Sequence, residues 1–342
     1  MRFDVHISKV RDPYWNLAAE EWFLDRAHEQ EPVLFLWQSR PTVVIGKNQN
    51  PWRECDVMWM AAEQIDLARR ISGGGAVYHD EGNLNYAFFM PREAYTPDDI
   101  YELVIAVLAE LGVEATRWNR TSLMVNDQKV SGNAFCLRRN VAMHHGTLLI
   151  NADRKRLSRS LKVPDWQITT KATASVPAPV QNLAACSDSI NVERVVNVFI
   201  EQLAIRKPVR LDGQWNLSAL TARVTELRSD TWLFDRTPPF EVTIPDNTGC
   251  YNFSVHSLGN TEVAPPVHAK QNQLLQQHSG GTCSVTSSEN RPKRIGNGYK
   301  QATRMAVEEG RIATSDRDSE WIGRPFREWV QHRHVASRQR AE

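Results

Sequence analysis

The sequence predicts an α/β (α+β) fold in which a mixed sheet carries helices on its face. Over the first 185 residues, short apolar runs typical of strands alternate with stretches of helical periodicity. Both tight hairpins and longer crossovers are expected between the strands, and that combination is typical of a mixed sheet. After about residue 250 both patterns disappear. We therefore expect a degenerate or disordered C-terminal region.

Bulky or alternating apolar side chains predict the strands. A strand at 1–10 is expected at the edge of a sheet. Strands at 33–38 and 42–47 are expected to be neighbours, and a further strand is expected at 144–153. Residues 122–132 are predicted to form a hairpin that turns at Asn126 and Asp127, because both residue types tolerate a positive φ.

The predicted helices begin at a capping residue or a proline. They cover 16–27 with Asn16 as the cap, 51–64 from Pro51, 96–112 from Thr96, and 192–205 from Asn191. The signal at 96–112 is complete: Thr96 can cap, Pro97 takes the first helical position, and Gly112 can end the helix.

Three regions follow from these patterns. Residues 1–185 are expected to form a mixed α/β domain, 186–250 a helical continuation, and 251–342 a polar, poorly ordered tail. Within 258–317, only nine of 60 residues are Leu, Ile, Val or Phe. That share is below the roughly 20% that separates folded from disordered composition.

Charge and cysteine content exclude several classes of protein. Lys plus Arg number 41 and Asp plus Glu 40, a balance unlike that of proteins that wrap nucleic acid. No apolar run reaches the roughly 20 residues of a membrane helix. The five cysteines contain no CxxC pair, which argues against a zinc ribbon and favours a reducing compartment. The N-terminus shows neither a secretory leader nor a clear organellar presequence.

The first chemical candidate is the run from Arg69 to Asp80, which contains Gly73, Gly74 and Gly75. Consecutive glycines are entropically costly, and they suit a place where backbone N–H groups form a concave nest for an anion. Arg69 and Arg70 are positioned to neutralise a phosphate there. The alternative is a glycine hinge beside a solvated arginine pair. The loop matches neither a Walker A motif nor GxGxxG.

The second candidate is Lys129, followed by Ser131 and Gly132 on the predicted hairpin. Small neighbours would leave the strand surface open to a ligand, so the ammonium could reach a phosphate or carbonyl oxygen. The alternative is an outward-facing, solvated lysine.

Other reactive side chains have structural explanations that we favour. His144 and His145 are adjacent on a predicted strand and therefore point to opposite faces, which does not suit a shared metal ion. His79 and Asp80 are adjacent in sequence, but adjacency does not make a catalytic dyad. Cys136 is expected to be buried and inert.

The chain resembles the lipoate–protein ligase A and lipoyltransferase family over roughly residues 10–240. The motifs that carry the resemblance are RRISGGGAVYHDEGN (69–83), PYWNLAAEEW (13–22), LFLWQSRPTVVIGKNQNPWRECD (34–56), KVSGNA (129–134) and HHGTLL (144–149). Within the family, KATASVPAPVQNL (171–183) resembles the animal mitochondrial lipoyltransferases.

The resemblance implies that residues 1–185 form a catalytic domain of the biotin/lipoyl-ligase type, which transfers a lipoyl or octanoyl group to a lysine ε-amine. It also implies the start of an accessory domain within 186–250. The acceptors would be the lipoyl domains of 2-oxoacid dehydrogenase E2 subunits, and the glycine cleavage H protein is one donor. The resemblance further implies a monomer that is located in mitochondria, or otherwise in the cytoplasm. It implies no binding to nucleic acid, membranes or a metal ion, and no tightly bound cofactor. Lys129 would be catalytic. The residues implied to bind lipoyl-AMP are Arg70, Gly75, Ala76, Val77, Tyr78, Arg120, Lys129, Thr147, Thr173 and Ser175.

One departure from the family pattern bears on the reaction. Where the family has an Arg-x-Asp-Leu motif, this chain has Arg120-Thr121-Ser122-Leu123. The missing Asp is associated with adenylate formation and magnesium, so a preformed acyl donor is favoured. The alternatives are a ligase that uses ATP and magnesium for both steps, and a non-catalytic module that binds acyl carriers. A biotin-ligase relative is disfavoured, because its GRGR-type loop is absent.

Overall fold

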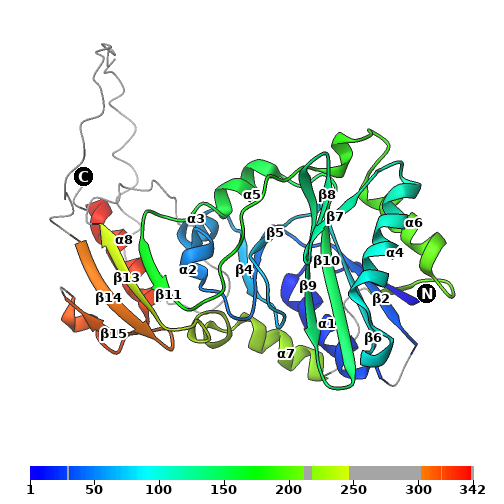
Figure 1. Ribbon diagram of the computed structural model, residues 1–342. Coiled ribbons are helices and arrows are strands. Elements are labelled where there is room, and N and C mark those ends of the chain that lie inside the picture. The colour runs from blue at the N-terminus through cyan, green and yellow to red at the C-terminus, as the bar shows by residue number, and fades with distance from the viewer. Residues whose placement is uncertain (29–30, 212–217, 246–301, 317, 340–342) are drawn as a thin grey trace, which may run out of the picture.

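The computed structural model describes residues 1–28, 31–211, 218–245, 302–316 and 318–339. Three sheets hold these residues together, as Figure 1 shows. The large mixed sheet has eight strands. From one edge to the other they are β12 (Val209–Leu211), β1 (Asp4–Ser8), β2 (Val33–Trp37), β6 (Asn83–Pro91), β10 (Val141–Leu149), β9 (Gln128–Leu137), β8 (Ser122–Val125) and β7 (Thr116–Asn119).

Two long helices cover one face of the large sheet (Figure 1). They are α4 (Pro97–Glu110) and α6 (Val192–Leu203). Their buried side chains, such as Val104 and Phe199, form one apolar core with Leu34 and Phe88 of the sheet. Burial of such side chains stabilises the fold by about 1.5–3 kcal/mol each.

The opposite face of the sheet packs against α1 (Pro13–Arg26), α7 (Ser218–Arg228) and a three-stranded sheet in the order β4-β3-β5. Its strands are β4 (Asp66–Arg69), β3 (Thr42–Ile45) and β5 (Val77–His79). The second core continues through this small sheet. The large and the small sheet therefore face each other, and their facing surfaces enclose the site described below.

A four-stranded sheet makes up the C-terminal part, in the order β11-β13-β14-β15. Its members are β11 (Gln167–Thr170), β13 (Phe240–Pro245), β14 (Ala302–Glu308) and β15 (Arg311–Ser315), and α8 (Phe326–Gln339) packs beside it. Shorter elements complete the fold: α2 (Pro51–Glu54), α3 (Val57–Ala62), α5 (Arg154–Ser160), η1 (Arg92–Ala94), η2 (Leu183–Ala185), η3 (Thr231–Asp235) and η4 (Ser319–Trp321).

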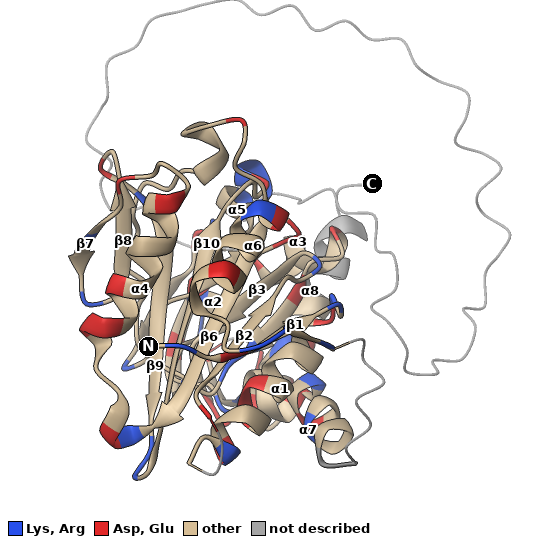
Figure 2. Ribbon diagram, turned by 90° about the vertical axis from the view of Figure 1, so that its right-hand side faces the viewer, with Lys and Arg blue, Asp and Glu red and all other residues tan. Residues whose placement is uncertain are grey.

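Residues of both charge signs are spread along the ribbon in Figure 2, with acidic residues on α4 and basic residues on α5. No helix among the described residues is long and apolar enough to cross a membrane.

The structure confirms the predicted mixed α/β architecture and several of its local signals. The hairpin turns at Asn126 and Asp127, which both have positive φ values of 48° and 59°. Helix α4 begins at Pro97 with Thr96 as its cap, and Gly112 follows it at φ +73°. Asn191 caps α6.

Four predictions about elements were wrong, the first two because distant strands decide the pairing and the last two because a neighbouring carboxylate caps the helix. The first strand is not an edge, since β1 pairs with both β12 and β2. Strands β2 and β3 belong to different sheets. The carboxylate of Asp12, and not Asn16, caps α1. The helix expected at 51–64 divides into α2 and α3 around Cys55 and Asp56, whose carboxylate caps the second helix.

The tail prediction fails for part of its range. Residues 302–316 and 318–339 form β14, β15 and α8, and their apolar side chains join the core shared with β13. Met305 and Val307 are both buried there. Low apolar content did not prevent order, because β13 supplies the pairing strand. Residues 251–301 of the same prediction lie outside the described part of the chain.

Candidate active site

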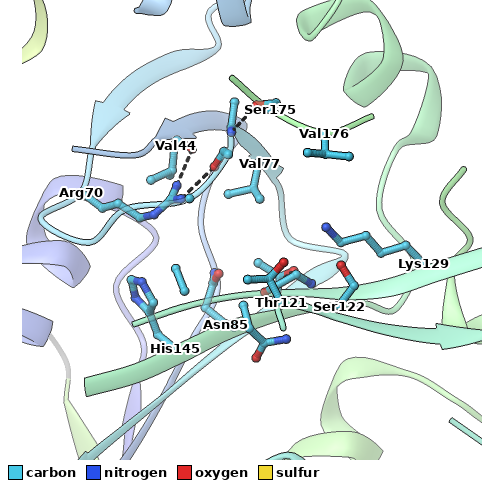
Figure 3. Close-up of a pocket in the computed structure, with 18 of the residues that line it drawn as sticks. Val44, Arg70, Val77, Asn85, Thr121, Ser122, Lys129, His145, Ser175 and Val176 are labelled. Atoms are coloured by element: carbon cyan, nitrogen blue, oxygen red, sulfur yellow. Dashed lines mark hydrogen bonds between the residues drawn. The ribbon is translucent and has the colours of Figure 1, made fainter. Parts of the chain in front are cut away.

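A cavity of about 260 Å³ lies between the large sheet and the small one. Its floor is the large sheet, including Asn85 of β6, Lys129 of β9 and Thr147 of β10. Its roof is the glycine loop together with the segment 173–178. Figure 3 shows this arrangement, with Val44, Arg70, Val77 and Val176 across the space from the floor residues.

Close backbone approach explains the glycines of the roof. A Cβ added to Gly46 would lie 2.4 Å from the carbonyl oxygen of Gly74, and Gly74 itself has φ +89°. A Cβ on Gly74 would lie 3.6 Å from Cβ of Ala134 in β9. The loop therefore reaches the same strand that carries Lys129. Both Gly74 and Gly75 line the cavity, and their amides have no hydrogen-bond partner among the described residues.

Arg70 holds the loop from behind. Its Nη2 donates to the carbonyl oxygens of Gly73 at 2.6 Å and Gly75 at 2.8 Å, and its Nη1 donates to the carbonyl of Val44 at 3.0 Å. Burial lowers the pKa of Arg70 to about 10, so the guanidinium stays charged at neutral pH. The positive charge lies beside the cavity, but its donors are committed to the loop carbonyls, to the carbonyl of Val44 in β3 and to the hydroxyl of Ser72.

Arg69 does not belong to the site. It is fully buried, and its guanidinium donates to the carbonyl oxygens of Gln49 at 2.8 Å and Leu233 at 2.6 Å and to Oγ1 of Thr237 at 3.0 Å. The expected pair of phosphate-neutralising arginines is therefore wrong for Arg69. The alternative of a solvated arginine pair is wrong for both residues, because both are buried and their donors face the protein.

Lys129 extends along the floor of the cavity. A Cβ added to Gly132 would lie 3.2 Å from both Cε and Nζ of Lys129, so the side chain passes closely over this glycine. Burial, and then the charge of Arg70, lower the pKa of the Lys129 ammonium. The described residues give the ammonium no carboxylate partner within salt-bridge distance. Lys129 is thus half-buried, lines the cavity and has no carboxylate partner among the described residues, which argues against the outward-facing alternative.

The segment 173–178 closes the cavity above Lys129. Oγ of Ser175 accepts hydrogen bonds from the amide of Ala76 at 2.8 Å and from Nε2 of Gln49 at 3.1 Å. The amide of Thr173 donates to the carbonyl of Asn48 at 3.0 Å. Further along, the amide of Lys129 donates to the carbonyl of Pro179 at 2.8 Å. The segment is tied at one end to the glycine loop and at the other to the strand of Lys129.

Most of the predicted site residues meet at this cavity. Those that line it are Arg70, Gly75, Ala76, Val77, Lys129, Thr147, Thr173 and Ser175. Tyr78 is buried in the core instead, since Val77 faces the cavity and neighbours on a strand point to opposite faces. Arg120 is exposed on the turn before β8, where its carbonyl accepts a hydrogen bond from Tyr101. Neither Tyr78 nor Arg120 lines the cavity.

The paired histidines do point to opposite faces, as predicted. His144 lies under the floor, 3.0 Å from Oδ1 of Asn133, and burial lowers its pKa to about 3. His145 lies on the cavity side. Asp80 accepts hydrogen bonds from the amides of Gly82 and Asp153, so it does not orient His79.

Sequence reasoning did not assign several residues of the cavity wall to the site. Glu20, Trp37, Asn85, Trp118 and His145 all line the cavity. Glu20 is buried in α1, and its carboxylate accepts hydrogen bonds from Trp37 Nε1 at 2.9 Å and lies 2.8 Å from His145 Nδ1. The sequence contained a signal for Glu20. On a helix this residue lies on the same face as Leu17 and Leu24, and an acid on an apolar helix face is predicted to be buried.

The donor set does not offer a metal site. Within the described ranges no group of three or more His, Cys, Asp or Glu side chains could hold an ion. Of the described residues that line the cavity, Glu20 is the one carboxylate, and it is already bonded to Trp37 and His145. Ser122, at the position where the family motif has Asp, lies on the cavity wall.

Comparison with known proteins agrees with this geometry. The lipoyl protein ligase A/B catalytic domain matches residues 12–204. The chain is 40% identical over 246 residues to the mitochondrial lipoyl amidotransferase LIPT1 of Mus musculus, covering 68% of this chain and 65% of that protein. It is 34% identical over 250 residues to the lipoate-protein ligase A of Bdellovibrio bacteriovorus, covering 70% and 74%.

Among solved structures, the chain resembles a bipartite lipoate protein ligase of Thermoplasma acidophilum, described with its E2 lipoyl domain. The TM-score is 0.54 at 22% identity, over 68% of this chain and 96% of that one. This likeness concerns the fold. The chain spans somewhat less than two thirds of the length of the mouse relative. The matched domain and the coverage of the bacterial ligase together establish that this chain belongs to the lipoyl protein ligase A/B family.

Proposed function

We propose that this protein is an acyltransferase that moves a lipoyl or octanoyl group from an acyl-adenylate to the ε-amine of a lysine on a carrier domain. The observation that supports it most is the shared cavity, with unpartnered glycine-loop amides on one side and the Lys129 ammonium on the other. Apolar wall residues, among them Leu17, Val44 and Val77, suit an eight-carbon chain. Each buried methylene contributes about 0.8 kcal/mol to binding.

In the proposed mechanism the carrier lysine attacks the acyl carbonyl of the mixed anhydride. The N–C bond forms, and the C–O bond to the phosphate then breaks, so AMP leaves with the electron pair. The attacking amine releases its proton to the phosphate or to solvent. The amides of Gly74 and Gly75 stabilise the phosphate, and the Lys129 ammonium stabilises the negative charge that develops on the carbonyl oxygen. The enzyme needs no nucleophile of its own.

In this proposal Arg70 acts on the phosphate through its long-range charge and through the loop that it holds. Thr147 and Gly132 keep the path of Lys129 fixed, since Oγ1 of Thr147 accepts from the Gly132 amide at 3.1 Å. Thr173 and Ser175 close the roof. Tyr78 and Arg120 have no direct role in the proposed binding, because neither lines the cavity.

Ser122 favours a preformed acyl donor over activation with ATP. A ligase that makes its own adenylate would need a group to hold magnesium beside the phosphates, and a serine hydroxyl is a weak ligand for a hard dication. The second candidate is therefore a lipoate ligase that performs both steps. A non-catalytic carrier-binding module is disfavoured, because Lys129 and the glycine loop face one cavity.

The proposed acceptors are the lipoyl domains of 2-oxoacid dehydrogenase E2 subunits, with the glycine cleavage H protein as a possible source of the acyl group. The Thermoplasma ligase of similar fold, which is described with its E2 lipoyl domain, supports an acceptor of this kind. The mitochondrial LIPT1 relative supports a mitochondrial location. We propose a monomer without a tightly bound cofactor.

The test mixes the purified protein with an apo lipoyl domain and either lipoyl-AMP, or lipoate with ATP and magnesium. Intact-mass spectrometry of the lipoyl domain reads the product. We expect modification with lipoyl-AMP only. Modification with both donors would favour the ligase. Modification with neither would leave transfer from a lipoylated donor protein and the binding module, and a third mixture with lipoylated glycine cleavage H protein separates these two.

A further inference from the structure

We propose that Glu20 and His145 are positioning residues that hold the glycine loop over the cavity, acting through Ser72 and Arg70. The proposal rests on the proposed function, because the loop is where the phosphate of the donor is expected to bind. The four side chains come from α1, β10 and the loop, and they form one continuous chain of hydrogen bonds.

The contacts of this chain are short throughout. His145 Nδ1 lies 2.8 Å from Oε2 of Glu20, and His145 Nε2 lies 2.7 Å from Oγ of Ser72. Arg70 Nε donates to the same Ser72 oxygen at 3.0 Å. The last step runs from Arg70 Nη2 to the carbonyls of Gly73 and Gly75 at 2.6 and 2.8 Å.

Hydrogen-bonding capacity gives the chain a direction. Arginine can only donate, so Ser72 Oγ accepts from Arg70, and its own hydroxyl proton is free to go to His145 Nε2. A His145 ring that accepts at Nε2 carries its proton at Nδ1 and donates it to Glu20. The chain therefore connects the guanidinium to the carboxylate through Ser72 and His145.

All four side chains of this chain of hydrogen bonds are buried, so water cannot replace a missing partner. Exposed fractions are 2% for Glu20, 6% for Arg70, 1% for Ser72 and 8% for His145. A buried carboxylate and a buried guanidinium are stable only when their polar atoms are satisfied. Trp37 Nε1 satisfies the second oxygen of Glu20 at 2.9 Å. Removal of one link leaves its neighbours in the chain with an unsatisfied polar atom. Without Ser72 Oγ, the guanidinium of Arg70 loses its Nε bond and keeps only its Nη bonds to Val44, Gly73 and Gly75.

The two ends of the chain serve different parts of the cavity. Glu20 and His145 line its wall, and Arg70 holds the glycine loop that forms its roof. Ser72 connects them without lining the cavity itself. A change at Ser72 therefore breaks the chain and leaves the walls of the acyl slot intact.

The test compares Ser72→Ala with the wild type on two ligands. Transfer from lipoyl-AMP reports on the whole site, and calorimetric binding of lipoamide, which has the acyl part but no phosphate, reports on the slot alone. We expect kcat/KM with lipoyl-AMP to fall about tenfold or more, as for loss of a hydrogen bond to a charged group. Lipoamide affinity should stay within about twofold. Ser39→Ala is the matched control, because Ser39 is also buried but bonds to Thr42 away from the cavity.

A second pair of variants keeps the proposal testable if Ser72→Ala folds poorly. His145→Gln keeps a hydrogen-bond donor and an acceptor on neighbouring atoms, whereas His145→Leu keeps neither. The first variant should therefore retain more transfer activity than the second. Equal activity in these two variants would overturn the proposal. So would an equal loss for lipoamide and lipoyl-AMP in Ser72→Ala, or no loss at all. Absence of transfer by the wild type would instead overturn the proposed function.

Discussion

The floor and the roof of the cavity are built by different means. The floor belongs to a continuous backbone ladder, in which β10 pairs with β6 over nine residues and with β9 over five. The roof is a loop whose shape depends on side chains: the guanidinium of Arg70 and the hydroxyl of Ser175 supply most of its bonds. Lys129 is therefore placed by the sheet, and the glycine amides are placed by a few polar contacts.

Because of this difference, substitutions in the floor and in the roof are expected to affect the transfer rate and the stability of the fold differently. Floor residues can lose their chemical groups while the ladder persists. Roof residues share hydrogen bonds, so a change at one moves the backbone of others. Variants of the floor should therefore lose rate at constant stability, and variants of the roof should lose both.

The largest effect is expected for Lys129→Ala. Loss of one preorganised charge that stabilises a developing oxyanion costs about 10²–10³-fold in rate. The sheet should keep its stability, because the ammonium has no carboxylate partner among the described residues. The measurement is the single-turnover rate with lipoyl-AMP, together with urea unfolding. Lys162→Ala, at an exposed lysine, is the control. Retained activity in Lys129→Ala would remove this residue from the mechanism.

Gly46→Ala tests the roof and should rank second. The added methyl group would meet the carbonyl oxygen of Gly74 at 2.4 Å, and backbone cannot yield as a side-chain tip can. Overpacking of this kind costs about 1–3 kcal/mol of stability. We expect both the unfolding free energy and the transfer rate to fall. Gly73→Ala is the matched control, since nothing lies within 4 Å of its added Cβ. If Gly73→Ala is as damaging as Gly46→Ala, close approach is not the reason for the glycine at 46.

The sequence could predict those parts of the site that are contiguous or periodic. The glycine loop and Lys129 each lie in one short motif, and the hairpin turn follows from Asn126 and Asp127 alone. The alternation of side chains along β5 determines which residues of the rest of the motif face the cavity. A strand alternates its faces, so the side of Val77 determined that Tyr78 would point into the core.

Partners far away in the chain explain what could not be predicted. Arg69 looked like a phosphate ligand, because its acceptors Leu233 and Thr237 come more than 160 residues later. Strands β14 and β15 looked too polar to fold, and their core is completed by β13 and Phe326. The buried chain from Glu20 to Arg70 joins three segments, and no local pattern connects them.

Gly132→Ala should displace the Lys129 ammonium without removing its charge, and its effect on the rate should be smaller than that of Lys129→Ala. Its Cβ would lie 3.2 Å from Cε and Nζ of Lys129, so the flexible end of that side chain must shift. We expect a rate loss of about tenfold, in keeping with the sensitivity of such reactions to small misplacement. The melting temperature should change little, since a side-chain tip moves more easily than backbone. A large drop in melting temperature with unchanged rate would contradict this view of the floor.

An effect that involves both the large and the small sheet is a dependence of stability on pH. Burial lowers the pKa of His144 under the floor and of His79 in β5 to about 3. In the unfolded chain both titrate near 6.5. Between these values the unfolded state binds more protons than the folded state, so stability is fully present above about pH 6.5 and falls as the pH drops towards 3. Each histidine contributes a slope of up to about 1.4 kcal/mol per pH unit. Urea unfolding at pH 7.5, 6.5 and 5.5 measures it. The slope should decrease in His144→Gln, and a slope that this substitution leaves unchanged would show that other groups govern the acid sensitivity.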